Sequence, residues 1–153
     1  MIIAIDSEFI EDGKTIKPVS LALVRQDGAE LYFEFEGVDW ESANPWVIAH
    51  VKPHLTGETT STIEIRNKIH GFVGEKPEFW GYYSDYDWVL FCQLHGSMIE
   101  LPSHYPMYCR DLIQLMDERR IKKEDFKSQE GVEHNALADA RWILSALKQA
   151  GKL

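Results

Sequence analysis

The feature that most constrains the fold is a short apolar run that ends in two carboxylates. Residues 1–5 are Met-Ile-Ile-Ala-Ile, and Asp6-Ser7-Glu8 follows directly. A run of this length and composition predicts a central strand that is buried on both faces. Residues two apart in an extended chain point to the same side, so Asp6 and Glu8 can reach one point in space. An unpaired buried carboxylate is costly, so at the end of a buried strand this pair needs either a bound cation or a salt bridge. The alternative is a pair of solvated acids at the strand end.

Two more strands are predicted over residues 20–25 and 30–36, separated by the turn Gln26-Asp27-Gly28. In the second of them apolar and polar residues alternate. This alternation predicts a hairpin with one face open to solvent, because one side of the strand carries Leu31, Phe33 and Phe35 and the other carries Tyr32, Glu34 and Glu36.

In the rest of the chain, apolar residues recur with the period of helices, and two further strands are predicted between these helices. Asn44-Pro45 predicts the start of a short helix, and Ser61-x-x-Glu64 predicts a capped helix that Gly74 ends. Further strands are predicted over 78–83 and 107–110, further helices over 87–94, 112–119 and 136–149, and a polar loop over 120–133. This order predicts an α/β protein with a mixed five-stranded sheet and helices on both faces, as in an RNase H-like fold.

Composition places limits on the class of protein. The 153 residues are 44% hydrophobic and 27% charged, without repeats or linkers, which predicts a single domain over 1–153. The first apolar run is too short for a membrane span and has no basic leader, so we expect a cytoplasmic protein without a membrane partner. Cys92 and Cys109 are far apart in the sequence, which favours reduced thiols over the alternative of a disulfide.

The net charge of −9 argues against a protein that coats nucleic acid, because such proteins present a basic face to phosphates. An enzyme that works through bound cations is a different case. Carboxylates that hold two Mg²⁺ ions would create a phosphate-binding site from acidic residues. The acidity is therefore compatible with a nuclease without indicating one.

Two other segments carry candidate site residues. Asp87 starts a helix after an aromatic strand, where the alternative role is a helix cap, and Asp85 competes for either role. His134 precedes the last helix, and Asp139 lies beside its apolar stripe, so that carboxylate faces the sheet and needs a partner. A surface histidine is the alternative for His134. The spacing of His50 and His54 does not predict a zinc site, since no cysteine pair or glutamate accompanies it.

Taken in order, three motifs resemble those of the DEDDh superfamily of 3′-to-5′ exonucleases. They are Asp6-x-Glu8, Tyr86-Asp87-x-x-Leu90-Phe91 and His134-Asn-Ala-Leu-x-Asp139-Ala-Arg. The segments DSEFIEDG and EHNAL are most similar to small bacterial exoribonucleases of mycobacterial type. The second motif departs from the commoner H-N-A-x-F-D form, which leaves Asp85 as the alternative to Asp87.

The resemblance implies that Asp6, Glu8, Asp87 and Asp139 hold two divalent cations, Mg²⁺ or Mn²⁺, and that His134 acts on the attacking water. It implies an exoribonuclease that releases nucleoside 5′-monophosphates from RNA 3′ ends, and a homodimer, because relatives in this superfamily are often homodimers. A DNA exonuclease or proofreading-type subunit has the same motifs, and a catalytically silent nucleic-acid-binding module is the second alternative. Base stacking and other substrate contacts are expected from residues near the motifs, namely Ser7, Phe9, Trp80, Tyr83 and Trp88.

Overall fold

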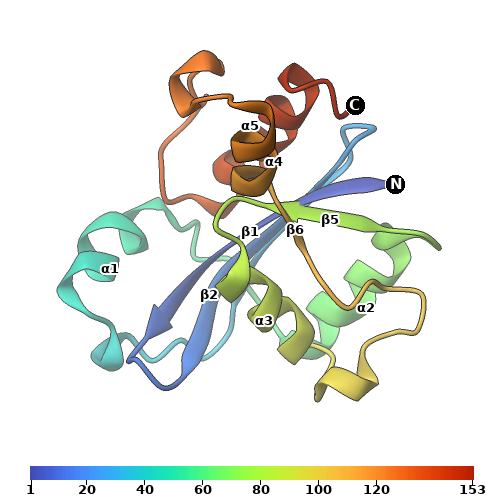
Figure 1. Cartoon of the computed structure of the whole chain (residues 1–153). Coiled ribbons are helices and arrows are strands. Elements are labelled where there is room, and N and C mark those ends of the chain that lie inside the picture. Colours follow the sequence, from blue (N-terminus) through green and yellow to red (C-terminus); the bar gives the residue numbers. More distant parts are fainter.

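The computed structural model describes the whole chain, residues 1–153, and its centre is a six-stranded mixed sheet with the order β4-β3-β2-β1-β5-β6 (Figure 1). Three long strands form an antiparallel meander, β1 (Ile2–Glu11), β2 (Ile16–Arg25) and β3 (Glu30–Phe35). On the far side of β1, two short strands continue the sheet in parallel, β5 (Glu78–Gly81) and β6 (Arg110–Asp111). The two-residue strand β4 (Thr59–Thr60) pairs with β3 at the other edge.

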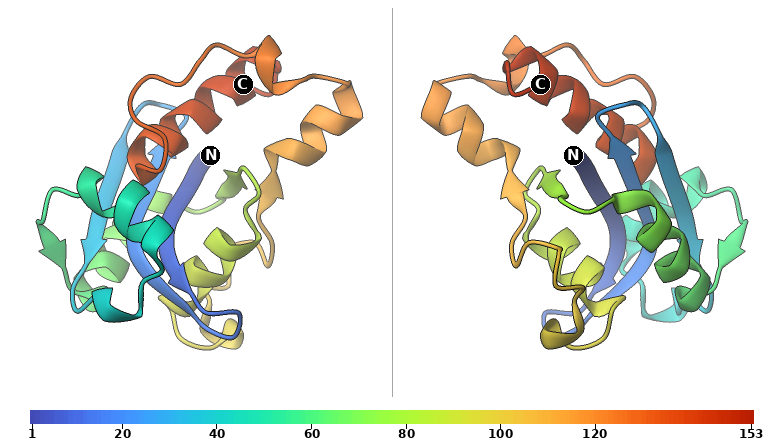
Figure 2. Two further views of the ribbon diagram at one scale, coloured as in Figure 1. Left: turned by 90° about the vertical axis from the view of Figure 1, so that its left-hand side faces the viewer. Right: turned by 90° about the vertical axis from the view of Figure 1, so that its right-hand side faces the viewer.

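Helices cover both faces of the sheet (Figure 2). One face packs against α4 (Leu112–Arg119) and α5 (Ala136–Gln149), and the other packs against α2 (Thr62–Val73) and α3 (Asp85–Gln93). Strand β1 supplies both cores, because its alternate side chains point to opposite faces. A third, smaller core joins α1 (Pro45–His50) to the C-terminal end of β1 and the N-terminal half of β2. Short 3-10 turns lie at Trp40–Ser42, Lys52–His54, Met98–Glu100 and Lys123–Asp125.

The predicted α/β class, with a mixed sheet and helices on both faces, is confirmed. The sheet has six strands instead of five, because the pair Thr59–Thr60 is too short to produce a pattern of its own. Strand β1 continues to Glu11, so the first two acids lie inside the strand and not after it. Strand β5 ends at Gly81, because the chain turns at Tyr83, whose φ of 56° is left-handed.

The predicted solvent face of β3 was wrong. Glu34 is only 2% exposed, and Tyr32 packs against the core under α5. The buried Glu34 carboxylate accepts hydrogen bonds from the Tyr32 hydroxyl and from the backbone N–H groups of Thr56 and Gly57. A buried acid can therefore stand in a strand as long as its oxygens are satisfied by donors.

The predicted helices are present. The side chains of Asn44, Ser61 and Asn135 cap α1, α2 and α5, and each accepts a hydrogen bond from a backbone N–H of the first turn. Helix α3 begins at Asp85, two residues before the predicted start. Both cysteines are free thiols. None of the helices has the length and apolar character needed to cross a membrane.

Candidate active site

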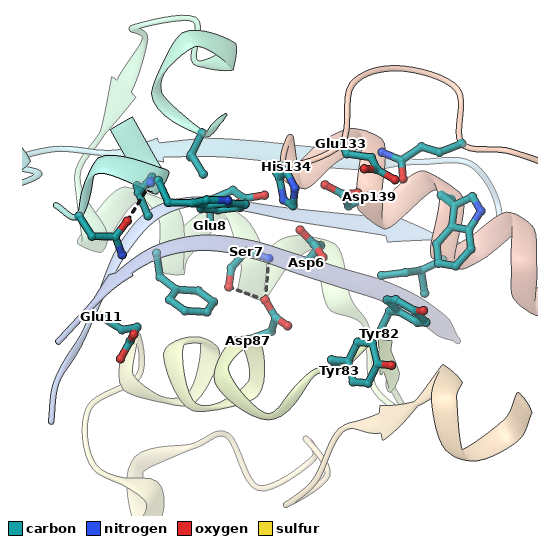
Figure 3. A pocket seen from close by; sticks show the side chains of 18 of the residues that line it. Asp6, Ser7, Glu8, Glu11, Tyr82, Tyr83, Asp87, Glu133, His134 and Asp139 are labelled. Atoms are coloured by element: carbon teal, nitrogen blue, oxygen red, sulfur yellow. Dashed lines mark hydrogen bonds between the residues drawn. The ribbon is translucent and has the colours of Figure 1, made fainter. Parts of the chain in front are cut away.

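A cavity of about 480 Å³ opens between β1, the N-terminal ends of α3 and α5, and α1 (Figure 3). All five residues that the motifs predict for catalysis line it, although they come from three distant parts of the chain: Asp6, Glu8, Asp87, His134 and Asp139. The fold therefore brings the three motifs to one place.

The centre of the site is a cluster of three carboxylates. Asp6 and Glu8 project from the same side of β1, and Asp139 reaches them from the first turn of α5. One oxygen of each carboxylate can be chosen so that all three lie within 4.8 Å of one another. A bulge in the β1–β2 pairing lies between Glu8 and Phe9, directly beside the cluster.

Burial raises the pKa values of all four acids, and the charges of neighbouring acids add to this effect for Asp6 and Glu8. Burial, followed by the charges of Asp87 and Asp139, raises the pKa of Asp6 well above its usual value. Burial, followed by the charge of Asp139, raises the pKa of Glu8 to about 8. The pKa of Asp87 rises to about 6, mainly through burial, and that of Asp139 rises for the same reason.

No lysine or arginine forms an ion pair with any of these four acids. The salt bridge that the sequence left open as an alternative is therefore absent. Clustered carboxylate oxygens are the ligands that hard divalent cations require. The residues present thus fit the divalent metal use that is typical of exonucleases.

The turn that leads into α3, and so positions Asp87, is held by contacts from the ends of β5 and β6. Gly81 ends β5 where the chain passes so close to Ser84 that a Cβ at position 81 would lie 2.3 Å from the Ser84 Cβ. Asp111 accepts hydrogen bonds from the backbone N–H groups of Tyr83 and Ser84 at 3.3 and 2.9 Å, which fixes the turn into α3. Asp87 is 6% exposed and lines the cavity, whereas Asp85 is exposed and does not line it.

His134 lies at the start of the turn into α5, with a left-handed φ of 64°. The next residue, Asn135, caps α5 through Ala138 N–H and donates a hydrogen bond to the carbonyl of His54. The His134 ring packs in a T-shaped arrangement against Trp46 from α1, with the ring centroids 4.7 Å apart. Figure 3 shows the imidazole near Asp6 and Asp139, on the opposite side of β1 from Asp87.

Of the residues predicted to contact substrate, Ser7, Phe9 and Tyr83 line the cavity. Trp80 and Trp88 do not, which corrects that part of the expectation. Trp80 packs into the core beneath α4 and α5. Trp88 packs against Phe79 and Phe91, with centroid distances of 5.2 Å to each ring. Both tryptophans occupy inward-facing positions of their elements, which the sequence pattern of this aromatic-rich region did not distinguish.

Several cavity residues were not predicted. Asn44, Trp46, Val47 and Val51 come from α1 and its end, a helix with no charged motif to mark it. Others come from the end of β1, from the residue after β5, from the polar loop and from α5: Glu11, Tyr82, Gln129, Glu133, Trp142 and Ile143. Regular alternation along β1 places Glu11 on the opposite side from Asp6 and Glu8, so it does not indicate Glu11. No pattern in the sequence connects α1 to the acids.

The fold is similar to that of Exonuclease I. A structure described as Exonuclease I (apo) superimposes with a TM-score of 0.66 at 15% identity, covering 99% of this chain and 42% of that chain. The Escherichia coli Exonuclease I crystal structure in complex with a dA16 oligonucleotide gives a TM-score of 0.65 at 14% identity, covering 99% and 41%. This chain thus spans about two fifths of those proteins. The likeness shows the RNase H-like fold.

Sequence comparison identifies closer relatives. The 3′-5′ exoribonuclease Rv2179c of Mycobacterium tuberculosis strain H37Rv is 36% identical over 144 residues, which cover 89% of this chain and 84% of that protein. The 3′-5′ exoribonuclease MT2234.1 of strain CDC 1551 matches to the same extent. The model of the 3′-5′ exoribonuclease Rv2179c-like domain matches residues 1–150. With the fold, the acidic cavity and this match in agreement, the chain belongs to the Rv2179c-like family of 3′-5′ exoribonuclease domains.

Proposed function

We propose that this protein is a single-domain 3′-to-5′ exoribonuclease that releases nucleoside 5′-monophosphates from RNA 3′ ends with the help of two divalent cations. The observation that carries this proposal is the convergence of Asp6, Glu8 and Asp139 within 4.8 Å, half-buried and without a lysine or arginine as counter-charge. Membership of an exoribonuclease family supports RNA as the substrate.

Asp6, Glu8 and Asp139 would hold one cation, and Asp87 together with Asp6 would hold the second. Ser7 donates two hydrogen bonds to Oδ1 of Asp87, so Oδ2 is the atom left to face a cation. Oxygen-only donors favour Mg²⁺ or Mn²⁺ over softer metals. When bound, two such cations activate a water molecule and neutralise charge on the phosphate and the leaving oxygen.

The protein's own groups supply positioning and proton transfer. His134 lies at the edge of the acid cluster and is not one of its ligands, which suits a general base that takes the proton of the attacking water. Phe9 stacks on Tyr86, with centroids 5.4 Å apart, and presents a ring to the cavity for the terminal nucleobase. The complete set of acids and histidine in one cavity argues against a catalytically silent binding module.

The proposal is tested with single-stranded RNA labelled at its 5′ end, a DNA of the same sequence, and a duplex with a 3′ overhang. In Mg²⁺ or Mn²⁺ we expect a ladder of RNA products shortened from the 3′ end, with slower loss of DNA. Faster loss of DNA would favour the DNA exonuclease alternative. If every substrate stays intact in both metals, the enzyme proposal fails. Light scattering during size-exclusion chromatography tests the homodimer that the resemblance implies.

A further inference from the structure

The cavity is strongly acidic and contains a single lysine or arginine, Lys123. Its other charged lining residues apart from His134 are Asp6, Glu8, Glu11, Asp87, Glu133 and Asp139. Cations held by the acids would attract only the scissile phosphate. The next phosphates of an RNA strand lie beyond that site, and they need positive charge from the protein.

A second hollow, of about 450 Å³, continues from the cavity along the loop before α5. The two spaces share four lining residues: Lys123, Gln129, Glu133 and Trp142. The second hollow then extends to Lys127 and Ser128. A path therefore leads from the carboxylate cluster past one lysine to another.

Trp142 of α5 contacts the side chain of Lys123 and the backbone of Lys127. The Nζ of Lys123 lies 5.5 Å from the centroid of the Trp142 ring and 5.6 Å from that of Tyr82. The indole N–H of Trp142 donates to the carbonyl of Lys127 at 3.1 Å, and the N–H of Lys127 donates to Gln149 at 3.0 Å. Phe126, between them, is buried in the core. The segment of the predicted polar loop that carries the two lysines therefore packs against α5.

Neither lysine is committed to a strong ion pair. Lys123 lies 4.0 Å from Glu133, and both side chains are more than half exposed. Exposed pairs of this kind contribute little and are readily exchanged for another anion. Lys127 has no carboxylate within ion-pair distance. Glu124 also lines the second hollow, and its exposed pair with Lys122 at 4.0 Å is of the same weak kind.

The arrangement of the cavity gives the path a direction. In Figure 3, Glu8 and Glu11 lie on one side of Asp6, whereas Tyr82 and Tyr83 lie on the other. Phe9, which is proposed to stack on the terminal base, follows Glu8 in β1 and so lies on the Glu8 side. The rest of the RNA strand therefore leaves the cavity past Tyr82, where Lys123 is found. We propose that Lys123 and Lys127 bind backbone phosphates of the RNA strand on the 5′ side of the scissile bond. This inference rests on the exoribonuclease function proposed above.

The test uses the double variant Lys123→Gln/Lys127→Gln on an octanucleotide RNA and on a dinucleotide that has only the scissile phosphate. We expect KM for the octanucleotide to rise about tenfold, with a much smaller rise for the dinucleotide. The slope of log(kcat/KM) against log salt for the octanucleotide should become shallower by about 0.7 for each lost phosphate contact. Lys122→Gln is the matched control, because Lys122 is adjacent in sequence, exposed, and lines neither space.

Equal rises in KM on both substrates would overturn the inference, as would an octanucleotide KM and salt slope like those of the wild type. An equal rise in the octanucleotide KM for Lys122→Gln would also overturn the inference, because the effect of the lysine charge would then not depend on its position. The wild-type protein in the same assay separates this failure from failure of the proposed function. If the wild type cleaves the octanucleotide while the double variant is unaffected, only the phosphate path is rejected. A wild type that cleaves neither substrate rejects both.

Discussion

Ser7 donates two hydrogen bonds to the same oxygen of Asp87, from its backbone N–H at 2.8 Å and from its hydroxyl at 2.5 Å. The contact joins β1 to the first turn of α3, and both residues are buried. It lowers the pKa of Asp87 against the larger, opposite effect of burial. The residue between the two acids of the first motif therefore orients the acid of the second.

Ser7→Ala removes the hydroxyl bond and leaves the backbone bond in place. A hydrogen bond to a charged group contributes about 1.5–3 kcal/mol, so we expect kcat to fall about tenfold or more, with a higher Mn²⁺ concentration needed for half-maximal activity. Ser20→Ala is the matched control, since that hydroxyl is equally buried in the neighbouring strand but lies outside the cavity. Equal losses in the two variants would show that Ser7 matters only for folding.

Asp87→Asn and Asp85→Asn separate the two candidates for the second motif. Asp87 is buried in the cavity and Asp85 is exposed outside it, so only the first change should lower kcat, by about a hundredfold. The melting temperature without metal should not fall in Asp87→Asn, because the amide has no charge to bury. A larger loss of kcat in Asp85→Asn would reverse the assignment.

Stability without metal should fall as the pH rises. The pKa of Glu8 is about 8 in the folded protein, and that of Asp6 is also raised, whereas both carboxyls titrate near pH 4 in an unfolded chain. Between those values the folded state holds protons that the unfolded state does not, so each such proton lowers the unfolding free energy by about 1.4 kcal/mol per pH unit. Urea denaturation in EDTA at several pH values measures this.

Excess Mn²⁺ should reduce or reverse that trend, because the cation takes the place of the protons and binds the native state alone. The control is the double variant Asp6→Asn/Glu8→Gln, which should show a flatter dependence on pH in EDTA. A wild-type stability that increases from pH 5 to pH 8 in EDTA would contradict the buried, uncompensated charges described here.

Phe9→Ala and Trp88→Ala should have different effects. Phe9 lines the cavity, and stacking on a base contributes about 1–3 kcal/mol, so its loss should raise KM about tenfold with a small change in melting temperature. Trp88 packs between Phe79 and Phe91, so its loss should lower the unfolding free energy by about 3 kcal/mol. Steady-state kinetics and urea denaturation distinguish the two. A KM effect for Trp88→Ala in the folded protein would restore it as a substrate contact.

The sequence predicts most of this fold because its local signals agree with the tertiary structure. Helix α5 begins and ends at the predicted residues, since the Asn135 cap and the apolar stripe coincide. The errors arise where long-range contacts determine whether a residue is buried or whether a strand forms. Glu34 resembles a solvent-facing residue until Thr56 and Gly57, more than twenty residues later, supply its donors. Strand β4 exists only because its two residues lie beside β3.

The meeting of the acids and His134 in one cavity could be predicted, because charge beside an apolar stripe or strand is unusual and because three motifs occur in order. The residues that form the walls of the cavity could not be predicted. Trp46 contacts His134 across 88 positions of sequence, and no local pattern marks that contact. Trp80 and Trp88 were placed at the site because they are near the motif in sequence, whereas their elements turn them towards the core.

The most direct test of the central claim is release of label from an RNA that carries it in the 3′-terminal nucleotide, with wild type and Asp6→Asn compared in Mn²⁺. The charges of all three other acids act on Asp6, and its amide removes a ligand without adding bulk. We predict that the wild type releases the label as a nucleoside 5′-monophosphate, and that Asp6→Asn or added EDTA abolishes the release. Full activity in Asp6→Asn, or label released in internal fragments, would contradict it.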